Sequence, residues 1–232
     1  MLILGITTST QQVGCAIGGH EGVLASVHSS RGKRHAETLT PAIEFITRQA
    51  RVDLSEISAV AIDVGPGLFT GLRVGVASAK AIAFALRVPM VGVVSLDLLA
   101  FAVRHSPRAI HAVLDARRGE VFTAAYRQVP GGVQRLAEPS VCSPDDLASD
   151  LVAADEECLL VGDGAIRHRE LFDQVRRVDI GEHSLANPSA GALVQLAHAK
   201  ALREDFVNTW DVEPLYLRLP DAEINWEQRS RT

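Results

Sequence analysis

Residues 2–29 read LILGITTSTQQVGCAIGGHEGVLASVHS, and the pattern of this segment is the first indication of the fold class. It holds three apolar runs, at 2–8, 13–19 and 23–29, separated by short turns made of Gly, Ser, Thr, Gln, His and Glu. Runs of this length between such turns are typical of β-strands. The stretch therefore predicts an antiparallel meander of three strands.

The same order of strands begins again in the second half of the chain. Three further runs, at 110–116, 120–127 and 133–141, read as strands with short turns between them. The first two lie about 108 residues after their counterparts, and a repeat of this size indicates two similar structural units.

Helices and single strands follow each meander in the same order. After the first meander we predict a helix at 35–50, a strand at 59–64, a helix at 70–86, a strand at 89–94 and a helix at 95–105. Pro41 lies inside the first of these helices, where a proline is unfavourable, and Ser95 is expected to cap the last. After the second we predict a short helix following Pro144, a strand at 158–164, a helix at 165–172 and a helix at 187–205 that starts from Asn187 and Pro188.

This order of elements predicts an α/β protein of two lobes, each built from a mixed sheet with a three-strand meander plus helices. We place the first lobe at residues 1–107 and the second at 108–232, and allow the C-terminal segment to pack back on the first lobe. A chain of 232 residues is long enough for two lobes with proper cores.

Composition and charge exclude several classes of protein. With 47% hydrophobic and 22% charged residues, the chain has the composition of a folded globular protein. Its net charge of −5 gives no general attraction to nucleic acid, so another subunit would have to supply most of any RNA-binding surface. We expect no signal peptide, because the first residues, MLILGITTST, have no basic leader and only a short apolar run. We expect no membrane span, because the apolar stretch 71–86 is interrupted by Arg73 and Lys80. Three cysteines without a close pair fit the cytoplasm and predict no zinc or disulfide framework.

The stretch DVGPGLFTGLRVG at 63–75 raises the question of a phosphate-binding loop. A Walker loop is excluded because the sequence has no Gly-Lys pair. The dinucleotide fingerprint is excluded because Gly65, Gly67 and Gly71 are spaced one residue too widely. The first N–H groups of the following helix could still hold an anion. The favoured interpretation is a tight Pro-Gly turn whose glycines allow a helix to pack closely.

That helix carries a ridge of small residues. Gly71, Gly75, Ala79 and Ala83 recur at i, i+4 spacing, which lets another backbone approach closely. The charged residues of the segment lie on one narrow stripe, so the helix lacks the broad polar face of a surface helix. We therefore expect it to be covered on two sides, by its own lobe and by a partner.

Isolated polar residues give weaker signals for a catalytic site. His35 has Leu39 at i+4 where a metal site would need a second histidine, so a solvated or capping role is favoured, and the basic run 31–34 reads as a solvated loop. Asp115 ends an apolar strand before a glycine turn; it is either a turn-forming residue or an anion- or metal-coordinating group in a cleft between the lobes. No arrangement of Ser, His and Asp or of Cys and His indicates a nucleophile with its base.

The two-lobed pattern resembles the actin-like (ribonuclease H-like) ATPase fold, and within it the chain resembles the TsaB (YeaZ) family of bacterial tRNA threonylcarbamoyladenosine biosynthesis proteins. The blocks that carry this resemblance run from residue 3 to residue 218 and read ILGITTST, HAETLTP, GPGLFTGLRVG, LDARRGEVF and EPLYLR. The resemblance implies a non-catalytic paralogue of the transferase TsaD, without catalytic, cofactor or metal residues of its own. It also implies a place in the complex that transfers a threonylcarbamoyl group to the adenosine beside the anticodon of ANN-decoding tRNAs.

Two positions depart from the family pattern. Thr7 stands where the family has an aspartate that, in actin-like ATPases, helps to hold the magnesium–phosphate group, and Leu68 stands where it has a serine. Both departures favour a scaffold over a catalyst. The alternative is an ATPase or kinase of the actin-like class that uses the inter-lobe cleft and Asp115.

The resemblance also implies partners. They are TsaD and TsaE, with tRNA contacted only through the complex and no membrane. The helices at 35–50 and 70–87 should form one face that pairs with TsaD, and the same face could give a homodimer when the partner is missing. The predicted interface residues are Leu39, Ile43, Ile46, Gly71, Leu72, Gly75, Val76, Ala79 and Ala83.

Overall fold

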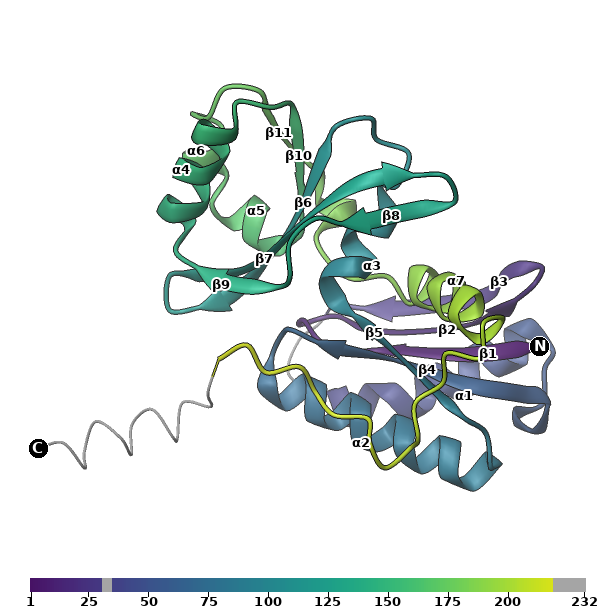
Figure 1. Cartoon of the computed structure of the whole chain (residues 1–232). Helices are drawn as coiled ribbons and strands as arrows, with labels where there is room; N and C mark the ends of the chain where they lie inside the picture. The colour runs from purple at the N-terminus through teal and green to yellow at the C-terminus, as the bar shows by residue number, and fades with distance from the viewer. Residues whose placement is uncertain (31–34, 219–232) are drawn as a thin grey trace, which may run out of the picture.

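Two separate sheets define two lobes in the computed structural model, which describes residues 1–30 and 35–218 (Figure 1). The first sheet has the order β3-β2-β1-β4-β5. Its meander is antiparallel, and β4 and β5 extend it in parallel. The strands are β1 (Leu2–Thr7), β2 (Val13–Gly19), β3 (Gly22–Ser29), β4 (Ile57–Gly65) and β5 (Met90–Val94).

The second sheet repeats this plan with the order β11-β10-β6-β7-β8, and β9 pairs with β7. Again an antiparallel meander is extended by parallel strands. The prediction of two actin-like α/β lobes is therefore confirmed. The strands are β6 (Ala109–Arg117), β7 (Glu120–Val129), β8 (Gly132–Arg135), β9 (Ser140–Cys142), β10 (Cys158–Val161) and β11 (Val178–Ile180).

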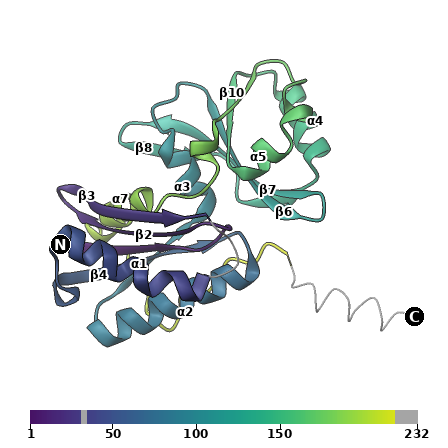
Figure 2. The same cartoon turned by 180° about the vertical axis from the view of Figure 1, so that it is seen from behind.

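Helices cover both faces of the first sheet. The helices α1 (His35–Ala50) and α2 (Phe69–Leu86) pack on one face, and α7 (Ala190–Ala201) packs on the other (Figures 1 and 2). The strands leave room for α7 because Gly5 and Gly18 have no side chain: a Cβ on Gly5 would lie 2.8 Å from a methyl group of Val194. One layer of the first lobe therefore comes from late in the chain.

A short helix, α3 (Ser95–Ala102), connects the lobes and contributes to both cores. Its Leu98 and Phe101 pack with the first sheet and α7, whereas Leu96 and Leu99 pack with the second sheet. Three helices flank the second sheet: α4 (Pro144–Ala154), α5 (Asp163–Arg167) and α6 (Arg169–Phe172). Short 3-10 turns occur at Leu54–Glu56 and His183–Leu185.

Several predicted element boundaries were wrong. The run 133–141 forms two short strands, and β11 was not predicted. The last helix begins after Ser189, whose hydroxyl accepts from the Ala192 N–H, and not after Asn187. Ser95 does not cap α3, because its hydroxyl donates to Asp63 in the neighbouring strand.

After α7 the chain returns along α2 as an irregular segment, residues 206–218, which we call the C-terminal strap (yellow in Figure 1). The Val207 N–H donates to the Met90 carbonyl at 2.9 Å, and the Leu215 N–H donates to the Val64 carbonyl at 2.7 Å. At its end Arg218 forms an ion pair with Glu120, 2.8 Å apart, so the strap joins the first lobe to the second.

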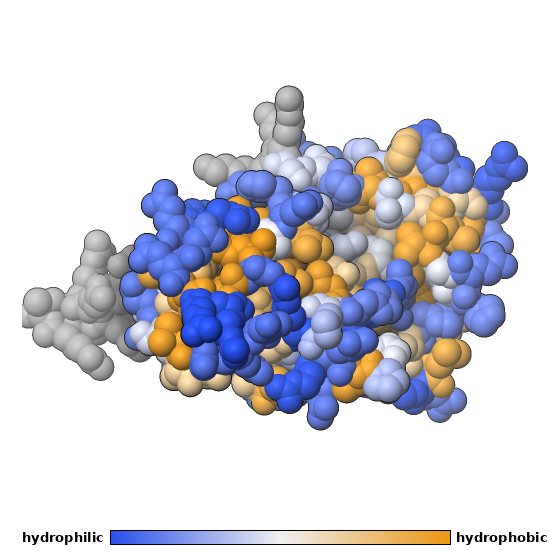
Figure 3. Space-filling model, turned by 90° about the horizontal axis from the view of Figure 1, so that it is seen from above, coloured by the Kyte–Doolittle hydropathy of each residue, from blue (hydrophilic) through white to orange (hydrophobic). Residues whose placement is uncertain are grey.

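The surface mixes both kinds of side chain: seen from above, hydrophobic groups alternate with hydrophilic ones (Figure 3). Of the helices in the described part of the chain, α2 is long and apolar enough to cross a membrane by length and composition alone. It packs against β4 through its buried side.

Candidate functional site

The glycines before and within α2 bring its start against the loop that follows β1. A Cβ on Gly67 would lie 2.1 Å from the Ser9 carbonyl oxygen, and one on Gly71 would lie 2.1 Å from the Thr8 carbonyl oxygen. The Leu68 N–H donates to the Ser9 carbonyl at 2.6 Å. The glycines thus serve close packing between two backbones of the same chain.

The predicted interface ridge faces the interior of the first lobe, which corrects the sequence-based assignment. The structure buries all nine predicted interface residues: Leu39, Ile43, Ile46, Gly71, Leu72, Gly75, Val76, Ala79 and Ala83. The neighbour that needs the smooth ridge is Thr8, whose hydroxyl lies 2.1 Å from the place of a Cβ on Gly75. Small residues at i, i+4 spacing show that a backbone approaches closely, but they do not show which one.

The opposite side of α2 carries a second row of mostly small and apolar residues, and this row is exposed or half-exposed. We call it the outer stripe; it consists of Thr70, Val74, Ala77, Ala81 and Phe84. Phe84 is 67% exposed and touches the ring of Trp210 in the strap, with centroids 5.9 Å apart. On the adjacent α1, Phe45 is also exposed. The outer stripe of α2 and Phe45 of α1 therefore expose apolar side chains to solvent, but these residues differ from those predicted.

A fully buried carboxylate, which the sequence analysis missed, lies at the end of β4. Both oxygens of Asp63 are satisfied: Oδ2 accepts from Thr7 at 2.7 Å and from Ser9 at 2.5 Å, and Oδ1 accepts from Ser95 at 2.5 Å and from the Gly65 N–H at 3.0 Å. Burial raises the pKa of Asp63, and these hydrogen bonds act in the opposite direction. Like Asp115, Asp63 ends an apolar strand before a glycine, which is the signal that could have found it.

The hydroxyl of Thr7 is therefore part of this internal network. The end of β1 supplies a donor to a buried acid, where actin-like ATPases are expected to have a carboxylate facing the cleft. The network also joins three segments: the end of β1, the end of β4 and the start of α3. Because α3 links the lobes, Asp63 helps to hold the start of this helix in place against the first sheet.

In the cleft between the lobes, Asp115 is neutralised by arginines of the chain itself. One of its oxygens lies 3.1 Å from Arg117 and 3.1 Å from Arg167, and its other oxygen accepts from the Arg117 N–H at 2.9 Å. The last bond is the turn-forming contact that the sequence suggested. Asp163 lies beside it and accepts from the Asp115 N–H at 2.9 Å. These residues line a cleft of about 330 Å³.

This donor set fits a magnesium–nucleotide poorly. Guanidinium groups occupy the positions around Asp115 where a hydrated cation would have to bind, and a cation is repelled by them. Within residues 1–30 and 35–218, no three His, Cys, Asp or Glu side chains are grouped so as to hold a metal ion. His35 is buried, and its Nε2–H donates to the Thr10 carbonyl at 2.8 Å, so its expected solvated position was wrong. The basic run 31–34 lies outside the described residues.

Asp163 should make the stability of the protein depend on pH. Burial raises its pKa from 3.8 to about 6, so the folded state holds the proton that the unfolded state has already lost between pH 4 and 6. The contribution of Asp163 to the free energy of unfolding therefore falls as pH rises through this range, by about 2–3 kcal/mol, and then stays constant. The Asp163→Asn variant should lose this part of the pH dependence in urea unfolding curves. Identical pH profiles for the variant and the wild type would contradict the assignment.

Comparisons with known proteins agree with this architecture. Residues 22–226 match the family model described as "TsaD: tRNA N6-adenosine threonylcarbamoyltransferase". The TsaB protein of Bacillus subtilis, a tRNA threonylcarbamoyladenosine biosynthesis protein, is 29% identical and aligns over 97% of this chain and 98% of its own. The structure of YeaZ from Pseudomonas aeruginosa superposes with a TM-score of 0.80 at 28% identity, covering 93% of this chain and 99% of that one. Component A of the Acidaminococcus fermentans (R)-2-hydroxyglutaryl-CoA dehydratase, at 11% identity and a TM-score of 0.52 over 87% of this chain and 99% of its own, shares the fold alone.

Proposed function

The chain belongs to the TsaD family of tRNA N6-adenosine threonylcarbamoyltransferases, and on that premise we propose that it is a non-catalytic subunit that binds and activates the transferase TsaD. The observation that carries the proposal is the end-to-end similarity to proteins named TsaB, which act in tRNA threonylcarbamoyladenosine biosynthesis. The complex would transfer a threonylcarbamoyl group to the adenosine beside the anticodon, with TsaE as a further component. We place this activity in the cytoplasm.

The side-chain contacts in the cleft between the lobes favour a non-catalytic role over a catalytic one. Asp115, the residue that the alternative of an ATPase or kinase would use, is held by Arg117 and Arg167. The hydroxyl of Thr7 is engaged by Asp63. An enzyme of the actin-like class would need a carboxylate and a magnesium ion at the phosphates. Here Asp115 and Thr7 are engaged in contacts within the chain, which disfavours binding of a magnesium ion beside them.

The surface for the partner is the face formed by α1 and the outer stripe of α2. A row that includes Val74, Ala77, Ala81 and the exposed ring of Phe84 is more apolar than the solvent side of a surface helix usually is. Small side chains let a partner helix approach at short distance, so such a face suits packing against another helix pair. The same face would explain self-association of the chain in the absence of TsaD.

Size-exclusion chromatography with light scattering tests the proposal. The chain mixed with TsaD of the same organism should elute as one complex, and the isolated chain should show no ATP hydrolysis above the blank. Separate elution of the two proteins, together with ATP hydrolysis that is lost in Asp115→Asn, would instead favour the enzyme alternative.

A further inference from the structure

A groove of about 440 Å³ lies at the end of α2, between its last turns and the strap. Residues of the segment 83–88 form one wall, and residues 208–210 of the strap form the other. Phe84 belongs both to this groove and to the outer stripe. The groove therefore continues the face that we assign to the partner, and it brings the strap into that face.

Two aromatic rings of the groove are exposed to solvent. Trp210 is 70% exposed and Phe84 is 67% exposed, and Trp210 is the most exposed large hydrophobic side chain within residues 1–30 and 35–218. The two rings meet edge to face with their centroids 5.9 Å apart, so they form one apolar patch. Tryptophan is among the residue types that contribute most to binding energy when a partner covers them. The patch therefore has the composition of a binding site for an apolar group.

The backbone that carries the Trp210 ring is held in place. Lys80 on α2 donates to the Trp210 carbonyl at 3.0 Å, and the Trp210 N–H donates to Asn208 Oδ1 at 3.0 Å. Two residues later, Val212 is buried in the core of the first lobe. A ring on a fixed backbone loses less freedom when a partner covers it, and this smaller entropy loss favours binding.

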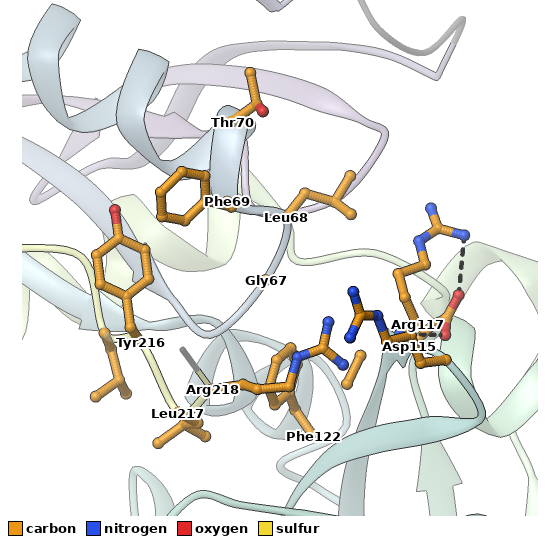
Figure 4. A pocket seen from close by; sticks show the side chains of 13 residues that line it. Gly67, Leu68, Phe69, Thr70, Asp115, Arg117, Phe122, Tyr216, Leu217 and Arg218 are labelled. Atoms are coloured by element: carbon orange, nitrogen blue, oxygen red, sulfur yellow. Dashed lines mark hydrogen bonds and ion pairs between the residues drawn. The ribbon is translucent and has the colours of Figure 1, made fainter. Parts of the chain in front are cut away.

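The strap forms a similar aromatic pair at the start of α2, and there the neighbouring arginine is engaged. The rings of Phe69 and Tyr216 lie 5.2 Å apart, centroid to centroid, at the wall of a second pocket (Figure 4). Arg73 donates to the Tyr216 hydroxyl at 3.3 Å, and its guanidinium lies over the Phe69 ring. This arginine therefore completes its aromatic pair within the chain.

Arg87 has the same relation to the other aromatic pair but is not engaged. It follows Phe84 by three residues, as Arg73 follows Phe69 by four, and it is exposed at the groove. Within the described part of the chain it has no ion pair, side-chain hydrogen bond or ring contact, and the described residues that line the groove include no Asp or Glu. A guanidinium in this state attracts a carboxylate, to which it can donate two hydrogen bonds. The groove can therefore bind an apolar side chain and a carboxylate together.

Nucleic acid fits this groove less well than protein does. Exposed aromatic rings can stack on bases, and arginine can bind phosphate. However, the exposed carboxylates of Asp211 and Glu213 follow Trp210 on the strap, and the chain as a whole has a net charge of −5. These charges repel a run of phosphates, whereas a single carboxylate can still pair with Arg87. The groove therefore favours a protein segment.

We propose that the groove receives a segment of the protein partner in which an apolar side chain lies near a carboxylate. The apolar side chain packs against Phe84 and Trp210, and the carboxylate pairs with Arg87. The inference rests on the proposed function, because it assigns the segment to TsaD. It adds the strap to the binding surface and gives the outer stripe a charged end, which fixes the register of two helix faces that could otherwise slide.

The first test is the dissociation constant for TsaD, measured by calorimetry at low and at moderate salt. Trp210→Ala should weaken binding about tenfold or more, because the covered ring is lost. Arg87→Glu should also weaken binding about tenfold, and more strongly at low salt, whereas Arg87→Lys should keep much of the affinity.

Two matched controls accompany these variants. Leu202→Ala removes an exposed apolar side chain at the end of α7, and Arg176→Glu makes the same change of charge at an exposed position of the second lobe. Both should bind TsaD within about twofold of the wild type. Circular dichroism checks that each variant is folded.

The second test follows the Trp210 ring itself. The chain has two tryptophans, Trp210 and Trp226, so a Trp226→Phe chain labelled with 5-fluorotryptophan gives a single ¹⁹F resonance. Unlabelled TsaD should shift this resonance and remove its response to the exchange of H₂O for D₂O, because the partner shields the ring from water.

Two outcomes would overturn the groove assignment and leave the proposed function intact. One is a complex with TsaD that forms without a change at Trp210, and the other is wild-type affinity of Trp210→Ala and Arg87→Glu. No binding of TsaD by the wild-type chain would overturn both. A resonance that changes with tRNA alone, or with rising concentration of the isolated chain, but not with TsaD, would assign the groove to nucleic acid or to a second copy and overturn the proposal.

Discussion

Replacing Ala79 by arginine is expected to unfold the first lobe. Ala79 is fully buried on the inner side of α2, in the cluster that also holds Ile62 and Val76. An arginine there would overfill a close-packed core and bury a charge without a partner, at a cost of at least about 3–5 kcal/mol. Whole domains are stable by only about 5–15 kcal/mol, so much of this protein's stability would be lost. Urea unfolding followed by circular dichroism should show a large drop in the midpoint or no cooperative transition.

The matched control lies two residues away on the same helix. Ala77 belongs to the outer stripe and is exposed, so Ala77→Arg should change the free energy of unfolding by no more than about 0.5 kcal/mol. Comparing Ala79→Arg with Ala77→Arg therefore distinguishes the buried side of α2 from its exposed side. An Ala79→Arg protein with the wild-type midpoint would show that the ridge is not packed against its own lobe.

Ala77→Arg is expected to abolish the complex with TsaD while leaving the chain folded. A long charged side chain in the middle of the outer stripe would hold the two helix faces apart, and burying it unpaired costs about 3–5 kcal/mol, which weakens binding by a factor of about 10² to 10⁴. Isothermal calorimetry or size-exclusion chromatography with light scattering measures this directly.

The same substitution at a remote position serves as control. Ala153 is an exposed alanine near the end of α4 on the second lobe, and Ala153→Arg should bind TsaD as the wild type does. Normal binding by a folded Ala77→Arg protein would mean that the outer stripe is not the partner surface, wherever else TsaD binds.

Much of the fold could be predicted from the order of strands and helices. The meanders were recognisable because short apolar runs are separated by residues that favour turns, and β2 lies at the predicted residues. The cap of α3 and the start of α7 were predicted wrongly, because a serine or asparagine near a helix start can cap the helix or bind elsewhere. Ser95 binds Asp63, and Ser189 provides the cap expected from Asn187.

The candidate site could be predicted only in part. Small residues at i, i+4 spacing identified α2 as a closely packed helix, but the contacting backbone at Thr8 is set by the tertiary fold and cannot be read from spacing. The Asp63 network joins residues up to 56 positions apart in sequence, so no local pattern indicates it. Asp115 was recognised as a turn residue, yet its second arginine, Arg167, comes from α5.

Transfer of the threonylcarbamoyl group to tRNA, reconstituted from purified proteins, shows whether the chain activates TsaD without being a transferase itself. TsaD and TsaE are supplied with threonylcarbamoyl donor and an ANN-decoding tRNA, and modified adenosine is quantified with wild-type chain, with Ala77→Arg, with Ala153→Arg and with no addition. We expect full transfer with wild type and Ala153→Arg, transfer near the no-addition level with Ala77→Arg, and none from the chain alone. Transfer by the chain without TsaD, or equal transfer by TsaD and TsaE with and without the chain, would rule out its role as an activating subunit.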